Sequence, residues 1–234
     1  MELLLNFAKG PLFALCFTVM ILGLLRIVIL TIWGMKSALN NTLDKNVPYK
    51  NLFKETLTWI IPWQHISKTR PVFSALSFIF HIGLVIVPVF LLDHILLWRS
   101  GLGISWLALG KVIADVLTIT TLTMAVILLG LRIFDRNSRF ISGVMDYLLM
   151  IMIIVIFASG FFASRSFNPV PYKLTMLIHV LCGNAILFLI PFTKLAHCFL
   201  YPLMRFASNI AWRFPARAGE EINMALYGEE NRKV

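Results

Sequence analysis

Charged residues are scarce in this sequence, and acidic residues are the scarcest of them. Its 234 residues include 21 lysines and arginines but only 11 aspartates and glutamates, so that 14% of the chain is charged. A soluble domain has about a quarter charged residues, whereas this chain is 59% hydrophobic and has a mean hydropathy of +0.84. The composition therefore excludes an ordinary soluble domain and favours an integral membrane protein.

Cysteine is also rare, and no cysteine pair has the spacing of a metal or redox motif. The three cysteines, Cys16, Cys182 and Cys198, lie in apolar runs and form no C-x-x-C sequence. This absence argues against a thioredoxin motif, a structural zinc site and an iron–sulfur cluster within the chain. Because there is also no C-x-x-C-H sequence, any haem must be bound without a covalent link to the protein.

The long apolar runs predict an all-α bundle of five transmembrane helices. A helix needs about 20 mainly apolar residues to cross a membrane. Five runs meet this requirement: residues 12–33, 73–98, 107–131, 141–162 and 174–204. We therefore expect one transmembrane domain over residues 1–204 and a cytoplasmic docking tail over residues 205–234. The connection between the first two helices includes an amphipathic segment, residues 52–66, which we expect at the cytoplasmic membrane interface.

Basic residues mark one side of these predicted helices as cytoplasmic. The segments that follow the first, third and fifth helices contain most of the lysines and arginines, whereas the N-terminus and the other two connections contain few. Under the positive-inside rule, the N-terminus lies outside and the C-terminus lies in the cytoplasm. Since topology accounts for the net charge of +10, we expect contacts with membrane lipid and none with nucleic acid.

Four histidines lie within the predicted helices, where an ionisable side chain is costly and is by default a functional candidate. The second helix has His81 and His94, and the fifth has His179 and His197. Because these helices run in opposite directions, the topology places His94 and His179 near the outer face and His81 and His197 near the cytoplasmic face. The fifth histidine, His65, falls in a cytoplasmic loop.

Two histidines at one depth on neighbouring helices can supply both axial ligands of a haem, since neutral imidazole binds iron. We therefore predict two b-type haems, one between His81 and His197 and one between His94 and His179. The 18-residue spacing of His179 and His197 is five turns and places both on one helix face, about 27 Å apart. His81 and His94 are 13 residues apart, so on a regular helix their side chains would point in directions about 140° apart. A kink at Pro88 would bring them onto one face.

Two other interpretations of the histidines stay open at this point. A single buried histidine is more often hydrogen-bonded to a neighbouring helix. A site for a bare metal ion would need the histidines to be clustered, often with carboxylates. The predicted depths separate the histidines across the membrane and disfavour such a cluster.

Several short motifs give the chain a family resemblance. Residues 191–197, Pro-Phe-Thr-Lys-Leu-Ala-His, are similar to P-F-S-R-L-x-H, and residues 80–83 match F-H-I-G. Further similar segments are Leu25-Arg26, Arg132-x-Phe134-x-Arg136-x-x-Arg139 and Gly143-x-x-Asp146. Over about residues 22–202 the chain resembles the cytochrome b (gamma) subunit of respiratory nitrate reductase. It also resembles the related small membrane subunits of heterodisulfide-reductase-like and sulfate-reducer redox complexes.

One departure places the chain nearer to the second group. The nitrate reductase subunit has another histidine ten residues after the first in this helix, whereas this chain has Leu91 there and its next histidine is His94. The resemblance implies two haems b on the four histidines. It also implies quinone or quinol exchange beside the outer haem, with menaquinone or ubiquinone as the substrate. The family's quinone-site lysine falls on Lys111.

The remaining candidates are charged groups in or near the helices. Lys111 either donates a hydrogen bond to a quinone carbonyl or is an interfacial lysine that extends toward water. Asp93 and Asp115 are candidates for accepting quinol protons, and orientation of His94 is an alternative role for Asp93. Arg26, within the first helix, is a candidate partner for haem propionates.

These features predict an electron-transfer subunit of a quinone-linked oxidoreductase in the inner membrane of the cell. The chain has no flavin or nucleotide fingerprint and no predicted catalytic residue, so the inner haem must exchange electrons with another subunit. A cytoplasmic iron–sulfur subunit is the expected partner, and other membrane or outer-face cytochrome subunits are further candidates. The alternative is a haem-free membrane anchor for a peripheral redox enzyme. A transporter is disfavoured because the chain shows no repeated halves.

Overall fold

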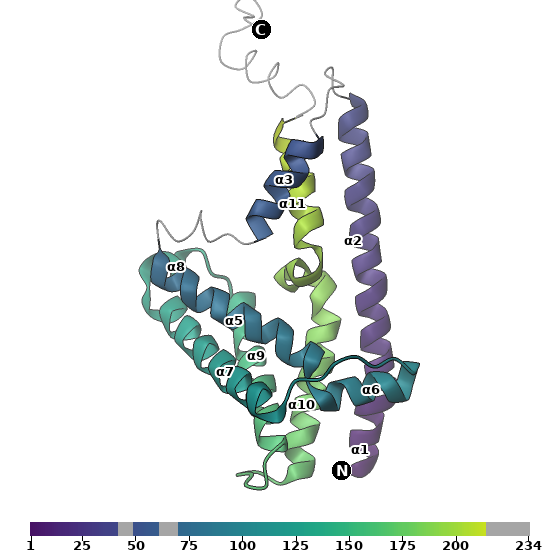
Figure 1. Cartoon of the computed structure of the whole chain (residues 1–234), viewed down its shortest axis with the longest axis vertical. Helices are drawn as coiled ribbons and strands as arrows, with labels where there is room; N and C mark the ends of the chain where they lie inside the picture. Colours follow the sequence, from purple (N-terminus) through teal and green to yellow (C-terminus); the bar gives the residue numbers. More distant parts are fainter. Residues whose placement is uncertain (42–48, 61–69, 214–234) are drawn as a thin grey trace, which may run out of the picture. The chain divides into compact units, whose positions relative to one another are not determined.

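The structure, a computed structural model, describes residues 1–41, 49–60 and 70–213. All regular elements in these ranges are helices (Figure 1). Five helical segments are long and apolar enough to cross a membrane: Glu2–Asn40, Pro71–Phe90, Lys111–Phe134, Val144–Ala163 and Tyr172–Phe192. The predicted all-α architecture with five spanning helices is therefore confirmed, and the chain is a multi-pass membrane protein.

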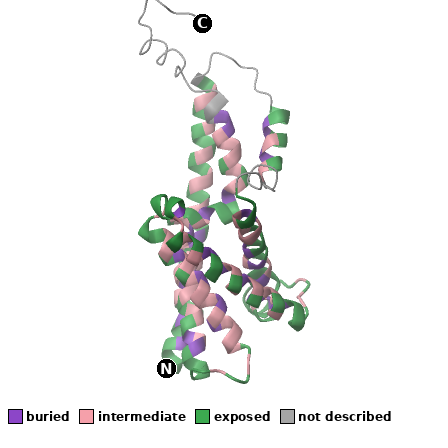
Figure 2. Ribbon diagram, turned by 90° about the vertical axis from the view of Figure 1, so that its left-hand side faces the viewer, coloured by how far each residue is buried: buried purple, intermediate pink, exposed green. Residues whose placement is uncertain are grey.

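Most of the surface of these helices is available to lipid. At most 22% of the residues in the most apolar part of any spanning helix are buried inside the protein, and exposed and half-buried residues follow the helices along their length (Figure 2). In water this much exposed apolar surface would drive aggregation, whereas in a bilayer it is the surface that contacts acyl chains.

The described chain divides into two compact units, and each is described by itself. The first unit comprises Met1–Phe17 and Trp63–Leu187, and the second comprises Thr18–Pro62 and Phe188–Val234. The predicted domain boundary at residue 204 stays a prediction. Residues 214–234 of the predicted docking tail, together with His65, lie outside the described residues.

In the first unit, α5 (Pro71–Phe90), α7 (Lys111–Phe134) and α9 (Val144–Ala163) pack together (Figure 1). Their apolar core consists of Phe80, Val87, Ala125, Leu128, Ile153 and Phe157. Helices α5 and α7 come close together at Gly83, where an added Cβ would lie 1.7 Å from Thr121 Oγ1. The buried Thr121 hydroxyl donates to the Leu117 carbonyl at 2.6 Å, so its polar atom is satisfied within its own helix.

The N-terminal helices of the first unit pack against α10 (Tyr172–Leu189). Helix α1 (Glu2–Phe7) leads into a π-helical turn, η1 (Ala8–Leu12), which contains Pro11 and so lacks one backbone donor. The buried side chain of Asn184 on α10 donates from Nδ2 to the Ala8 carbonyl at 2.8 Å. This bond ties the irregular turn to α10, as polar side chains often do between membrane helices.

The predicted second helix, residues 73–98, is wrong as a single element. Helix α5 ends at Phe90, Leu91 is extended with φ −70° and ψ 129°, and a separate helix, α6 (Leu92–Leu102), follows. The break comes three residues after Pro88, which lies inside α5 and whose missing backbone N–H leaves the Leu84 carbonyl, one turn earlier, without its usual donor. The direction of the His94 side chain is therefore changed by a full break of the helix and not by the predicted kink at Pro88.

The predicted fifth helix, residues 174–204, is also interrupted. Helix α10 ends at Leu189 and is followed by two short 3-10 turns, η2 (Ile190–Phe192) and η3 (Lys194–Ala196), before α11 (His197–Arg213). Thr193 between the turns is extended, and its hydroxyl accepts from the Leu195 N–H at 3.3 Å. His179 and His197 therefore do not lie on one regular helix, and the prediction that five regular turns separate them is wrong.

In the second unit, α3 (Tyr49–Ile60) packs against α11, and α2 (Phe13–Asn41) enters this unit from the first. Leu52 and Thr56 of α3 are buried. The Tyr201 hydroxyl donates to the Trp59 carbonyl at 3.0 Å, and the Arg205 guanidinium lies 4.2 Å from the Trp59 ring centre. This half-buried helix accounts for part of the predicted amphipathic segment, whose place at the membrane interface stays a prediction.

Candidate functional site

The structure brings His94 and His179 together within the first unit. Their ring centroids are 6.1 Å apart and the ring planes differ by 23°. Taking metal–nitrogen bonds of about 2.0 Å and about 1.1 Å from ring centre to nitrogen, two imidazoles opposed across one metal atom have centroids about 6 Å apart. The observed separation fits two axial ligands of a single iron.

Each ring of this pair is held through its Nδ1 atom. His94 Nδ1 donates to the Pro88 carbonyl at 2.9 Å, and His179 Nδ1 donates to the Ile156 carbonyl at 2.9 Å, with the Ser159 hydroxyl 3.3 Å from the same nitrogen. A carbonyl oxygen only accepts, so Nδ1 has the proton and the neutral ring keeps its lone pair on Nε2. Metal-binding histidines are commonly oriented in this way.

The break after α5 positions His94. Where the helix stops, three consecutive carbonyls lose the backbone donors that a continuing helix would provide. Each is instead satisfied by a donor from α6 or from the loop after it: Pro88 by His94 Nδ1, Val89 by Trp106 Nε1 at 2.9 Å, and Phe90 by the Leu109 N–H at 2.9 Å. The interruption that the sequence pattern did not predict is therefore a specific, hydrogen-bonded feature.

Gly160 on α9 makes room for the second ring. A Cβ added at this position would lie 2.8 Å from His179 Cε1 and 3.1 Å from Nδ1. Atoms this close would overlap, so only glycine leaves the ring where it is. Neither Gly160 nor Ser159 was predicted as a site residue, although a glycine inside a helix of large apolar residues often marks close packing.

One aromatic side chain, Trp98, lies on the same helix as His94 and contacts two further aromatic rings. Trp98, one turn further along α6, contacts the Phe17 ring edge-on with a centroid distance of 5.6 Å, and the Trp106 ring is 6.3 Å away. These rings add apolar surface close to the histidine pair. Such surroundings suit a large apolar macrocycle and lower the local dielectric constant.

His81 is an exposed residue of α5 in the first unit. Its Nδ1 lies 2.6 Å from the Ser77 carbonyl and 3.4 Å from the Ser77 hydroxyl. Gly83, two residues later, faces α7. Two residues rotate a helix by about 200°, so His81 points away from α7.

His197 is the first residue of α11 in the second unit, and its Nδ1 bonds the Lys194 carbonyl. Cys198 Sγ lies 4.0 Å from its Nε2 atom. All four predicted ligands therefore direct Nδ1 to a backbone carbonyl. Since His81 and His197 belong to different units, their pairing stays a prediction.

The predicted quinone-site residues lie near the ends of α6 and α7. Lys111 is the exposed first residue of α7, and Asp115 follows one turn later. Asp115 Oδ2 is 2.7 Å from Nη2 of Arg165, whose guanidinium lies 4.6 Å from the Phe161 ring centre. Asp93 is exposed in the first turn of α6, where a carboxylate complements the helix dipole.

These observations bear on the alternative roles of the aspartates. The Nδ1 partner of His94 is the Pro88 carbonyl and not the Asp93 carboxylate. Arg165, which pairs with Asp115, was not predicted to belong to the site. The roles of Lys111, Asp93 and Asp115 toward a quinone stay predictions.

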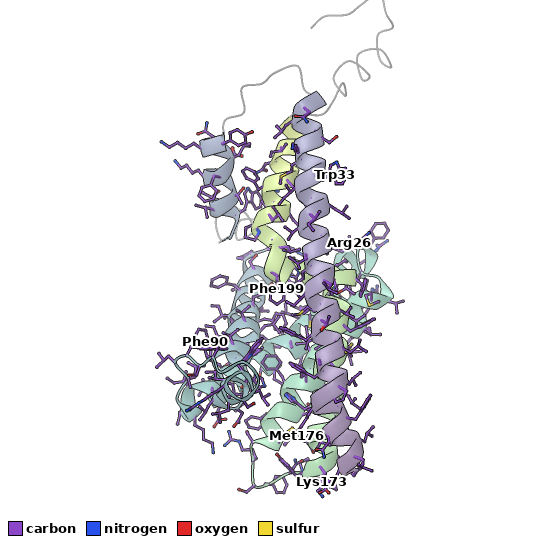
Figure 3. All side chains as sticks on the ribbon, turned by 90° about the vertical axis from the view of Figure 1, so that its right-hand side faces the viewer. Arg26, Trp33, Phe90, Lys173, Met176 and Phe199 are labelled. Carbon is purple, nitrogen blue, oxygen red and sulfur yellow. The ribbon has the colours of Figure 1, made fainter. Side chains whose placement is uncertain are left out.

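Arg26 lies on α2 in the second unit and is exposed (Figure 3). It stands one turn after Gly23, where an added Cβ would lie 2.4 Å from Pro191 Cβ, so α2 and η2 are in close contact there. Among the described residues, its guanidinium takes part in no hydrogen bond or ion pair. Its role toward haem propionates stays a prediction.

The described ranges contain no group of three or more histidine, cysteine, aspartate or glutamate side chains that could hold a metal ion. A bare metal ion would need such a cluster, whereas a haem iron, which the macrocycle already coordinates, needs two. The residues present fit a haem between His94 and His179 better than a free ion.

Comparison with known proteins gives one clear relationship. A protein of Nitratidesulfovibrio vulgaris (strain Hildenborough) is 30% identical to this chain over an alignment of 203 residues that covers 85% of this chain and 89% of that protein. No family model and no solved structure matches the chain.

Proposed function

The chain belongs to the same family as the Nitratidesulfovibrio vulgaris protein, and we propose that it is a dihaem cytochrome b subunit of a respiratory redox complex. The proposal rests above all on His94 and His179, whose centroids are 6.1 Å apart and whose Nδ1 atoms both bond backbone carbonyls. This arrangement leaves the Nε2 lone pair of each ring able to bind a metal atom.

In this proposal His94 and His179 hold the outer haem, and His81 and His197 hold the inner one. The Nδ1 bonds of His81 to Ser77 and of His197 to Lys194 give these rings the same tautomer. When bound, each haem supplies an iron centre that accepts and releases one electron. Arg26, a cation in an apolar helix, is the proposed counterion for the propionates.

The protein's own contribution to the outer site is orientation. The carbonyls of Pro88 and Ile156 fix the two rings, and hydrogen bonds of this kind make a ligating imidazole more basic. Gly160 leaves space beside His179. The surrounding apolar helices exclude water, and together these factors adjust the reduction potential.

Quinone exchange is proposed at the end of α7 that begins with Lys111. Lys111 and Asp115 are four residues apart and so share one helix face. In this proposal Lys111 donates to a quinone carbonyl, while Asp93 and Asp115 accept protons from a quinol, which is menaquinol or ubiquinol. The Arg165 partner keeps the Asp115 carboxylate in one position.

The expected complex lies in the inner membrane of the cell, with the C-terminus of this chain in the cytoplasm. A cytoplasmic iron–sulfur subunit is the proposed electron partner of the inner haem, and residues 205–234 are the proposed docking segment. The orientation follows from the distribution of lysines and arginines, and the partner follows from the lack of a flavin, nucleotide or iron–sulfur motif in the sequence.

The test is the haem content of the full chain, purified in detergent after expression with added haem precursor. A reduced-minus-oxidised spectrum and a pyridine haemochrome assay should give two haems b per chain. A folded chain that binds no haem would be an anchor subunit instead. Circular dichroism of the same sample separates that outcome from a misfolded protein.

A further inference from the structure

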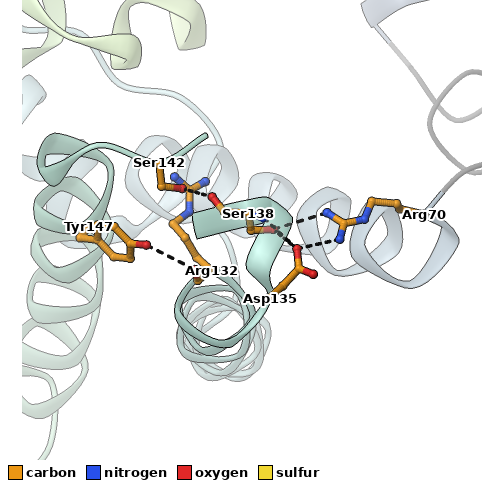
Figure 4. A network of polar contacts seen from close by, with 6 residues as sticks. All are labelled: Arg70, Arg132, Asp135, Ser138, Ser142 and Tyr147. Atoms are coloured by element: carbon orange, nitrogen blue, oxygen red, sulfur yellow. Dashed lines mark hydrogen bonds and ion pairs between the residues drawn. The ribbon is translucent and has the colours of Figure 1, made fainter. Parts of the chain in front are cut away.

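The turn between α7 and α9, residues 134–144, is held in shape by its own polar contacts (Figure 4). It contains the short helix α8 (Arg136–Phe140). Asp135 Oδ2 accepts from Arg70 Nη2 at 2.7 Å and from the Ser138 hydroxyl and N–H at 2.6 and 2.9 Å. The Ser142 hydroxyl donates to the Ser138 carbonyl at 2.6 Å. The turn is therefore preorganised for any partner that it binds.

Both acidic groups at this turn are already neutralised. Asp135 is paired with Arg70, and Asp146 accepts from the Gly143 N–H at 3.0 Å and lies 3.7 Å from Arg132 Nη1. The Tyr147 hydroxyl further donates to the Arg132 carbonyl at 3.3 Å. Neither carboxylate is available to balance another cation.

Two arginines of the turn keep an uncompensated charge. Arg136 and Arg139 are exposed, and within the part of the chain that the structure describes their guanidinium groups make no hydrogen bond, ion pair or ring contact. They line a shallow depression together with Asn137, Phe140 and Ile141. The turn therefore presents two free guanidinium groups, each suited to a phosphate.

Large apolar side chains surround these arginines. The exposed fractions are 84% for Phe134, 92% for Phe140, 77% for Ile141 and 84% for Val144. Phe134 ends α7 and Val144 begins α9, and both helices are long and apolar enough to span a membrane. The turn thus lies where the chain leaves the apolar layer, at the depth of the lipid headgroups.

We infer that the α7–α9 turn is a binding site for an anionic phospholipid. Arg136 and Arg139 bind the headgroup phosphate, and Phe140 and Ile141 lie against the upper acyl chains. An acidic protein surface would satisfy the arginines, but the direct continuity of Phe134 and Val144 with spanning helices places lipid here. Anionic leaflets attract basic residues at this depth.

The experiment is native mass spectrometry of the full chain in detergent, titrated with phosphatidylglycerol or with phosphatidylcholine of the same acyl chains. The wild type should bind phosphatidylglycerol more tightly than phosphatidylcholine. The Arg136→Gln/Arg139→Gln double variant should lose about 25-fold in phosphatidylglycerol affinity, from about fivefold per arginine. Its phosphatidylcholine affinity should fall much less, because the choline cation of that headgroup already offsets the phosphate charge.

Arg99→Gln is the matched control, since Arg99 is also exposed and also without a side-chain partner among the described residues. It lies in the last turn of α6, away from this turn in sequence. Equal binding of the two lipids, or an equal loss in Arg99→Gln, would overturn the inference. Complete displacement of phosphatidylglycerol by millimolar inorganic phosphate would also overturn it, because the site would then bind a soluble anion. Thermal unfolding of each variant shows whether it is folded.

Discussion

The Nδ1 atom of His94 donates a hydrogen bond to the Pro88 carbonyl, a group six residues earlier that belongs to a different helix. This bond satisfies a carbonyl at the end of α5, and it also fixes the tautomer of the imidazole. It therefore couples the end of one helix to the orientation of a ring whose centroid lies 6.1 Å from that of His179. A continuous helix from His81 to His94 would place them about 140° out of alignment.

The proposed pairing can be tested with double variants. His94→Ala and His179→Ala should each reduce the haem content from two to one, and the double variant should still retain one, because both changes remove the same site. The pair His81→Ala and His197→Ala should behave in the same way for the other haem. Pyridine haemochrome assays and low-temperature spectra of the purified variants measure the content and identity of the remaining haem.

His94→Ala combined with His81→Ala should bind no haem, since this combination removes one ligand from each site. His65→Ala serves as the control and should keep both haems. If the His94/His179 double variant lost all haem while remaining folded, the pairing would be wrong.

Sequence reasoning found the five spanning helices and singled out His94 and His179, which lie close together in the structure, because both depend on local composition. About 20 apolar residues must cross a bilayer regardless of their neighbours, and intramembrane histidines stand out in such runs. The predicted lengths failed at Leu91 and Thr193. Apolar character continues through both breaks, and only Pro88 and Pro191 marked the irregular stretches.

The residues around His179 could not be predicted for a different reason. Ser159 and Gly160 lie about 20 residues earlier on another helix, and their importance depends on how α9 meets α10. Likewise, the Val89 carbonyl accepts a hydrogen bond from Trp106 only because α5 ends at Phe90 and leaves that carbonyl without a backbone donor. Such relations come from tertiary packing, which a single sequence does not display.

Gly160→Ala should weaken the outer haem site without unfolding the protein. The new methyl group would meet His179 Cε1 at 2.8 Å, so the ring must move away from its present position. We expect about 10- to 100-fold weaker haem binding at this site, the range seen when ligand-orienting contacts are disturbed. Haem titration of the apoprotein gives the affinity.

Gly130→Ala is the control for this experiment, because nothing lies within 4 Å of a Cβ at that helical position. It should bind haem normally and be slightly more stable, since alanine favours helix. Normal haem affinity in Gly160→Ala would show that the His179 ring can shift at no cost.

Trp106→Phe should destabilise the break between α5 and α6. Phenylalanine keeps an aromatic ring but cannot donate to the Val89 carbonyl, which is 2.9 Å from the indole nitrogen. The loss of this bond should cost about 1 kcal/mol and lower the unfolding temperature by about 2–4 °C. Trp98→Phe is the comparison, since the Trp98 indole makes ring contacts and no hydrogen bond within the described residues. An equal loss in both variants would assign the effect to ring size.

Gly83→Ala should destabilise the packing of α5 on α7. Its Cβ would lie 1.7 Å from Thr121 Oγ1 and 3.3 Å from the Leu117 carbonyl, and overpacking of this kind costs about 1–3 kcal/mol. Adding Thr121→Ala removes the nearest atom and should restore part of the stability, so the two changes should be strongly non-additive. Thermal unfolding of the single and double variants in detergent measures the coupling. Additive effects would contradict the close approach of the two helices.

The stability of the α7–α9 turn should depend on pH through Asp135. The Ser138 hydroxyl first, and then Arg70, hold the pKa of this carboxyl well below its ordinary value of 3.8 by hydrogen bonds. A carboxylate whose pKa is lowered on folding stabilises the folded state above its unfolded pKa, and this contribution is lost as the pH falls through and below that value. The wild type should therefore lose this contribution progressively below about pH 5.

Asp135→Asn removes the titrating group, so it should be less stable than the wild type at pH 7 and the difference should shrink as the pH approaches 3. The measurement is thermal unfolding in detergent at pH steps between these values. Asp93→Asn, which removes an exposed carboxylate without a side-chain hydrogen bond among the described residues, controls for the loss of one charge. A constant difference between the wild type and Asp135→Asn at every pH would mean that Ser138 and Arg70 do not distinguish the ionised from the neutral carboxyl.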